Sequence, residues 1–201
     1  MNNTDLYLGV ASSIIYELNK RNIPSILFSV NENQKNSLEF FNDLGFHFLI
    51  NQKDISNQDT KVINLVKCIF KNYLRIKKLN KNKIIIDNNG GKRIYNILSR
   101  KKKFNKKKKL PSLYSRVFFN KKDGFYNVND YLINSYLLSR NLFSNRKNSI
   151  NTNLIKNIDH YIWWFKQPGK LYYLIRDKKI RLFFYHKIID INLTKYYYGG
   201  W

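Results

Sequence analysis

Short apolar runs alternate with helical patterns in the first part of the chain. The runs at Asp5–Val10 and Pro24–Val30 are typical of strands buried in a parallel sheet. Apolar residues at helical spacing occupy 12–22 and 34–44, and the run at 46–50 predicts a third strand. This alternation of strand and helix predicts an α/β arrangement, with a parallel sheet and right-handed crossovers.

A different pattern follows this segment. It predicts one long basic helix over 58–82, a short apolar run at 83–86 and a helix at 92–100. The sequence KKKFNKKKKL comes next and holds seven lysines in its first nine residues, followed by a proline. Mutual repulsion of these lysines predicts a linker over 101–113. The same run could instead attach the chain to phosphates or to a membrane surface.

The remaining residues, 114–201, predict an α+β domain. Its expected elements are a strand at 115–120, helices at 128–140 and 157–165, a hairpin of 170–176 and 179–189, and a strand that begins at 196–198. The length of 201 residues suits two small domains. We therefore predict one domain over 1–100, a linker over 101–113 and a second domain over 114–201.

Basic residues dominate the charge of the chain. Lysine and arginine outnumber aspartate and glutamate by 37 to 13, for a formal net charge of +24. Such a charge is typical of a protein that binds a polyanion, because lysines that neutralise phosphates release the counterions of those phosphates and so favour binding. It also follows from AT-rich codon use, since lysine occurs here with abundant Asn, Ile and Tyr. A hydrophobic fraction of 43% and an aromatic fraction of 16% exclude a disordered chain.

Two further features concern the compartment. Cys68 is the only cysteine, so the chain cannot form an intrachain disulfide, and its apolar neighbours indicate a buried thiol. No window approaches 18 uncharged apolar residues, and the first residues lack the order of a signal peptide. We therefore predict a cytoplasmic protein without a transmembrane segment, and no metal site.

Small residues from Gly9 to Ser13 precede the first helix. Parallel sheets bind ligands beyond the carboxyl ends of their strands, where backbone N–H groups can approach a phosphate. Glu17, which lies further along the helix, could accept hydrogen bonds from ribose hydroxyls. Simple packing of strand against helix explains the same residues without a ligand.

The stretch DLYLGVASSIIYELNKRNIPSILFSVNENQ resembles the C-terminal half of the UDP-sugar hydrolases of pseudaminic acid biosynthesis. Those enzymes act on UDP-2,4-diacetamido-2,4,6-trideoxy-β-L-altropyranose and are related to the B-type glycosyltransferases (GT-B). The positions in register are Asp5, Leu6, Gly9, Ser13, Glu17, Pro24, Glu32, Asn33 and Gln34, then Asp87, Gly90, Arg93 and Ile94. The resemblance implies a Rossmann-like parallel sheet, equivalent to the GT-B C-terminal half, over 1–100.

The same resemblance implies a UDP-sugar site. Its residues would be Gly9, Ser12 and Ser13 at the diphosphate, Glu17 at the nucleoside, and Asn33 and Gln34 near the sugar or phosphate. In the family's turn two glycines stand where this chain has Ala11 and Ser12, and a threonine where it has Ile14, so side chains reduce the space for a phosphate. The family's N-terminal half, which supplies the hydrolytic acid or base, has no counterpart before Met1. We therefore expect a fragment that cannot hydrolyse the sugar alone.

A second resemblance covers Ser139–Trp164. This stretch is similar to the start of a GNAT-type N-acetyltransferase, a domain found fused to such hydrolases. The matching positions are Arg140, Asn141, Arg146, Ser149, Ile155, His160 and Trp163. The resemblance implies a partial GNAT-like domain whose substrate cleft is formed by Arg140, Asn141, Arg146, His160 and Trp163. No cofactor is expected to bind tightly, and acetyl-CoA would be the co-substrate of a complete domain, whose Gly-rich pyrophosphate turn is missing here.

These residues also have structural explanations. Trp163 and Trp164 suit a core or a cleft wall, His160 suits a hydrogen-bonded helix position as well as a base, and His186 suits cross-strand packing. Together the resemblances predict nucleotide-sugar processing by a fragment of a fused hydrolase and acetyltransferase, whose missing half another chain would supply. One alternative is a small basic RNA- or ribosome-binding protein that uses residues 101–109 and the long helix. Another is a non-catalytic scaffold.

Overall fold

A computed structural model gives the fold of the chain. The residues that it describes are 4–34, 38, 41–42, 46–57, 59–80, 89–99, 121–149, 151–167, 169–177 and 179–200. The expected linker at 101–113, the apolar run at 83–86 and the strand at 115–120 lie outside these residues.

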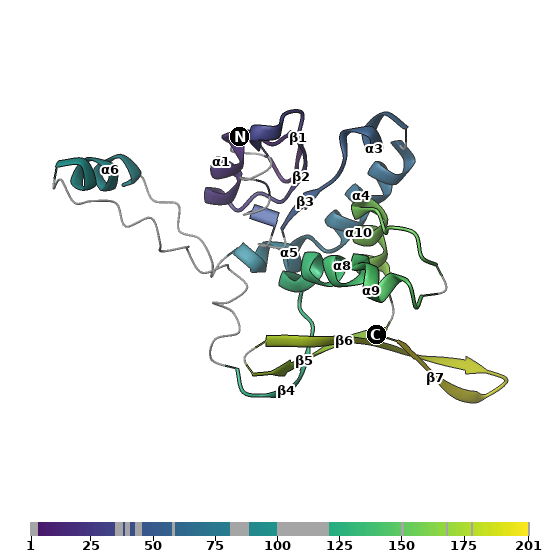
Figure 1. Cartoon of the computed structure of the whole chain (residues 1–201). Coiled ribbons are helices and arrows are strands. Elements are labelled where there is room, and N and C mark those ends of the chain that lie inside the picture. The colour runs from purple at the N-terminus through teal and green to yellow at the C-terminus, as the bar shows by residue number, and fades with distance from the viewer. Residues whose placement is uncertain are drawn as a thin grey trace.

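A three-stranded parallel sheet forms in the N-terminal half, as predicted (Figure 1). The elements of this part are β1 (Tyr7–Val10), α1 (Ile14–Lys20), β2 (Ser25–Phe28), the 3-10 helix η1 (Glu32–Gln34) and β3 (His47–Leu49). The sheet order is β1-β2-β3, and Ile26 on the central strand pairs with Leu8 and Phe48. α1 buries Ile15 and Leu18, which lie one turn apart on one face of the helix.

The predicted long basic helix over 58–82 is divided in two. The helices of this region are α3 (Gln52–Asn57), α4 (Asp59–Lys71), α5 (Tyr73–Asn80) and, further along, α6 (Gly90–Ser99). The break falls at Asn72, whose side-chain amide donates to the Cys68 carbonyl at 2.9 Å. Asparagine side chains compete in this way with helical backbone bonds, so α4 ends there and α5 starts in a new direction.

The C-terminal half combines helices with a second sheet. Its elements are β4 (Gly124–Asn127), η2 (Asp130–Leu132), α8 (Ile133–Asn141), α9 (Phe143–Arg146), α10 (Asn157–Lys166), β5 (Lys170–Arg176), β6 (Lys179–Ile191) and β7 (Thr194–Gly200). The strands form an antiparallel sheet in the order β4-β5-β6-β7. The predicted hairpin of β5 and β6 is confirmed, and the predicted further strand is β7. The chain is therefore mixed α/β with two separate sheets.

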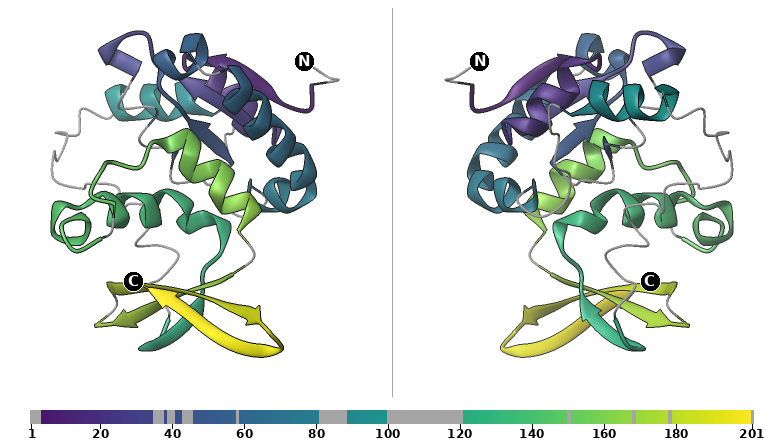
Figure 2. Two further views of the ribbon diagram at one scale, coloured as in Figure 1. Left: turned by 90° about the vertical axis from the view of Figure 1, so that its right-hand side faces the viewer. Right: turned by 90° about the vertical axis from the view of Figure 1, so that its left-hand side faces the viewer.

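α8 and α10 lie between the two sheets (Figure 2). On the side of the parallel sheet, the Phe48 ring meets Tyr161 and Phe165 of α10 edge-on, with centroids 5.3 and 5.6 Å apart. The Asn157 amide also donates to the Leu49 carbonyl at 2.9 Å. On the side of the antiparallel sheet, the ring centroids of Trp163 and Tyr185 are 5.8 Å apart. One hydrophobic core therefore contains residues from both halves of the chain.

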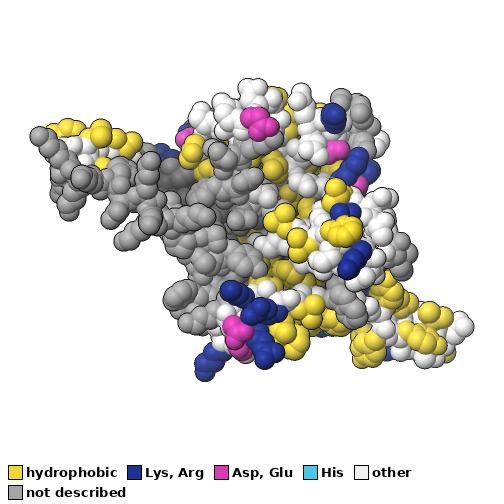
Figure 3. All heavy atoms as spheres, viewed as in Figure 1, with side chains coloured by type: hydrophobic (Ala, Val, Ile, Leu, Met, Phe, Trp, Pro, Cys, Tyr) yellow, Lys and Arg dark blue, Asp and Glu magenta, His cyan; other side chains and the backbone are white. Residues whose placement is uncertain are grey.

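α6 stands apart from this core (Figure 1). Its apolar side chains Ile94, Tyr95 and Leu98 are 60–70% exposed, and hydrophobic side chains cover one edge of α6 in the space-filling view (Figure 3). None of the helices in the described part of the chain is long and apolar enough to cross a membrane.

Candidate functional site

A cavity of about 300 Å³ opens beside the carboxyl ends of β1 and β2. The loop that follows β1 and the 3-10 helix η1 that follows β2 supply its walls. The lining residues are Ala11, Ser12, Ser13, Ile15, Tyr16, Asn33 and Gln34. The site is therefore at the edge of a parallel sheet where ligands commonly bind.

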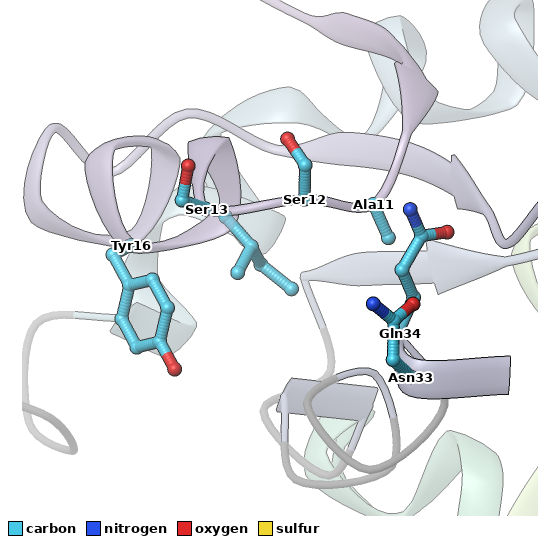
Figure 4. Close-up of a pocket in the computed structure, with 7 residues that line it drawn as sticks. Ala11, Ser12, Ser13, Tyr16, Asn33 and Gln34 are labelled. Atoms are coloured by element: carbon cyan, nitrogen blue, oxygen red, sulfur yellow. The ribbon is translucent and has the colours of Figure 1, made fainter. Parts of the chain in front are cut away.

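The side chains of this cavity come from two directions (Figure 4). The amides of Asn33 and Gln34 point from η1 toward Ala11, while the hydroxyls of Ser12 and Ser13 project from the other side of the loop. Gln34 Oε1 accepts a hydrogen bond from the Val30 backbone at 3.0 Å, which fixes this amide and leaves its nitrogen as a donor. The cavity thus combines amide donors with an apolar floor.

Two residues of the predicted UDP-sugar site do not line this cavity. A Cβ atom on Gly9 would lie 2.6 Å from the Tyr7 hydroxyl oxygen, so this glycine makes room for the Tyr7 side chain. Glu17 pairs with Arg21, the residue that follows α1, and this hydrogen bond lowers the pKa of the Glu17 carboxyl. The structure therefore brings Ser12, Ser13, Asn33 and Gln34 together, and it places Gly9 and Glu17 outside the lining.

Tyr16 is a lining residue that the sequence did not single out. Its ring contacts Phe41 edge-on at 5.3 Å and is 48% exposed. Tyr16 lies three positions after Ser13, so the two share one side of α1. That spacing was the only signal available for it in the sequence.

A second cavity, of about 230 Å³, lies between α8 and α10. Arg140, Ile155, Asp159, His160 and Trp163 line it. His160 is 2% exposed, and its Nε2 lies 2.8 Å from the Ile133 carbonyl oxygen. Burial lowers the pKa of His160 to about 4, so the ring is neutral at pH 7. Because the carbonyl can only accept, Nε2 carries the proton and Nδ1 is the accepting nitrogen.

Asn141 and Arg146 do not line this cavity. Asn141 makes two hydrogen bonds to the Ile155 backbone, at 3.0 Å to the carbonyl and 2.9 Å from the N–H. Arg146 donates to the carbonyls of Asn141 and Thr152 at 3.0 and 2.6 Å. These two residues therefore hold the chain before α10 so that Ile155 reaches the cavity. Of the five residues predicted for the acetyltransferase cleft, Arg140, His160 and Trp163 line this cavity. Asn141 and Arg146 lie outside the lining and hold the backbone next to it.

A third cavity, of about 320 Å³, adjoins the second and shares Arg140 and Trp163 with it. The antiparallel sheet supplies its other wall through Tyr185, Lys187 and Tyr198. The sequence did not indicate these three residues, because only the pairing of β6 with β7 brings Lys187 beside Tyr198.

Comparisons with known proteins leave the family open. No protein-family model, curated protein or solved structure matches this chain. Within the described residues, no three His, Cys, Asp or Glu side chains gather in a way that could hold a metal ion.

Proposed function

We propose that the chain binds a UDP-sugar in the cavity between α1 and η1 and takes part in nucleotide-sugar processing for nonulosonic acid biosynthesis. The observation that supports this proposal is the convergence of Asn33 and Gln34 on the loop of Ser12 and Ser13, beside the carboxyl ends of parallel strands. The proposal includes a Rossmann-like relation of this half to GT-B enzymes, and a cytoplasmic location.

The chemistry of the lining fits a nucleotide sugar. The amide nitrogens of Asn33 and Gln34 can donate hydrogen bonds to diphosphate oxygens, and the amide oxygen of Asn33 can accept a hydrogen bond from a sugar hydroxyl. The exposed Tyr16 ring offers a face to the uracil or to the apolar side of the sugar. Glu17 would reach a ribose only after releasing Arg21.

The cavity of His160 would hold an amino sugar during acetyl transfer. The amine nitrogen would attack the thioester carbonyl of acetyl-CoA, and the C–S bond would break to release CoA as a thiolate. The neutral His160 Nδ1 would accept the proton that the amine loses and pass it to this thiolate. Arg140 and Trp163 would position the sugar, since both line the same cavity. This part rests on the GNAT resemblance and on the neutral state of His160.

Calorimetric titration of the full chain with UDP tests the first site. We expect saturable binding that weakens about tenfold or more when Asn33→Ala and Gln34→Ala are combined, because each removes a hydrogen bond of about 1 kcal/mol. Gln52→Ala is the matched control, since it truncates an exposed amide on α3 that does not line the cavity. No heat from UDP, or equal weakening by the control, would contradict the proposal.

A further inference from the structure

The antiparallel sheet has a face that no described element covers. Leu171, Tyr173 and Ile175 on β5 are buried toward the helices, so Tyr172 and Leu174 project from the opposite face. In Figures 1 and 2 the helices lie on one side of this sheet only. We call the uncovered side the outer face of the sheet.

Aromatic rings gather on the outer face. Tyr172 pairs with Phe184 on β6, and its ring stacks on His186 with centroids 5.4 Å apart and planes within 4°. The ring centroids of Phe184 and His186 are 6.0 Å apart. Phe125 on β4 and Tyr197 on β7 lie on the same face, because their cross-strand partners do, and they are 68% and 80% exposed. Rings on all four strands are thus open to solvent on one side.

Cations surround these rings. The four strands contain six Lys and Arg residues and one carboxylate, Asp190. Lys170 is the register partner of His186, and Lys195 and Arg176 have the outer-face parity of their strands. Asp190 lies on the same face as the register partner of Lys195, so the face keeps an excess of cations. In Figure 3, basic side chains gather where β5 turns into β6, and apolar side chains cover the β6–β7 hairpin. The outer face therefore has the charge that complements a polyanion and the rings that stack on bases.

We infer that the outer face binds single-stranded nucleic acid. Bases stack on Tyr172, Phe184 and Tyr197, and phosphates contact Lys170 and Lys195. Strands about 4.8 Å apart give a four-stranded face roughly 14 Å wide, which accommodates about two or three nucleotides. The rings need unpaired bases, so a duplex is a poorer ligand. This activity is separate from the UDP-sugar cavity, which lies on the other sheet.

Fluorescence anisotropy with a labelled oligouridine tests this inference on the full chain. The lysine-rich run contributes general attraction to any polyanion, so the decisive comparison is between two tyrosines on one strand. Tyr197→Ser, on the outer face, is expected to weaken binding by about fivefold or more, since stacking on one aromatic ring contributes about 1–3 kcal/mol. Tyr196→Ser changes a 51% exposed ring on the opposite face and should stay within about twofold of the unchanged chain.

Three results would overturn the inference. Equal effects of the two serine variants would show that the outer face makes no contact with the bases. Equal affinity for oligouridine and for a duplex of the same length would indicate attraction by charge alone. A dimer in light scattering that Tyr197→Ser converts to monomer, without loss of RNA affinity, would identify the face as a contact between copies. Phe125→Ser, which removes a 68% exposed ring on β4, provides a second variant for each measurement.

Discussion

Burial keeps the His160 ring neutral at pH 7. The ring is 2% exposed and is held by the Ile133 carbonyl, and desolvation lowers its pKa to about 4, with a smaller contribution from Arg140. The sequence left open whether His160 is a hydrogen-bonded helix residue or a base. The structure shows the hydrogen bond and a neutral ring, and it leaves the role of base as a proposal.

Acid should destabilise the fold through this residue. The folded pKa lies below the ordinary value of 6.5, so the stability that neutral His160 contributes is complete above pH 6.5 and is lost as the pH falls to about 4. The loss should reach about 3 kcal/mol. We expect His160→Gln to show a weaker fall in the free energy of unfolding across this window, measured by urea denaturation at several pH values. The same fall in both proteins would show that His160 titrates normally when folded.

A two-residue turn joins β6 to β7. Asn192 and Leu193 both have positive φ, at 50° and 65°, and Ile191 pairs with Thr194 directly beyond them. Turns of this kind favour glycine at the second position, because a side chain there is strained. Leu193 is also fully exposed and gains nothing from packing.

Leu193→Gly should therefore stabilise the hairpin by about 1 kcal/mol, seen as a higher melting temperature. The same substitution on α8, Leu138→Gly, should lower stability by about 1 kcal/mol, because Leu138 is an exposed helical residue with 65% exposure. If both variants are destabilised, strain at Leu193 is absent in solution.

Periodicity in the sequence predicted most of the elements that the structure describes, and it failed where side chains act locally. The parallel strands and α10 follow from apolar runs and helical spacing. The division of α4 from α5 depends on the Asn72 amide, and the β6–β7 turn lacks the usual glycine, so neither could be predicted. In the site, the i,i+4 spacing of Glu17 and Arg21 makes their ion pair local, whereas the approach of η1 to the loop after β1 depends on packing between distant segments.

At the scale of the whole molecule, a buried carboxylate helps to join the two halves. Asp130 on η2 is 5% exposed and accepts hydrogen bonds from Arg75 of α5 and, at 2.9 Å, from Trp164 of α10. Tyr131, the next residue, donates to the Leu79 carbonyl at 3.1 Å. These ionic and hydrogen-bond contacts thus hold the two halves together in addition to the apolar packing of Phe48 against α10. The sequence could not predict these contacts, because a hydrophobic pattern shows which face of a helix or strand is buried but not which other element covers it.

Asp130→Ala should lower the stability of the whole molecule by about 3 kcal/mol, because it leaves the Trp164 N–H buried without this acceptor. A shared core also implies that both halves unfold in one transition. We expect tryptophan fluorescence, which reports on the C-terminal half, and far-UV circular dichroism to give the same midpoint in urea. Separate midpoints would show that the halves fold independently.

Asn141 and Arg146 do not line the His160 cavity, but their side chains hold the backbone beside it through hydrogen bonds. They fix the backbone on which Ile155 sits, so a change at either residue reshapes the His160 cavity from a distance. In an activity assay alone, the loss of one of these hydrogen bonds would look like the loss of a contact with the ligand. A change at Trp163, which lines the cavity, instead tests a contact of the lining without removing the hydrogen bonds that hold the backbone of Ile155.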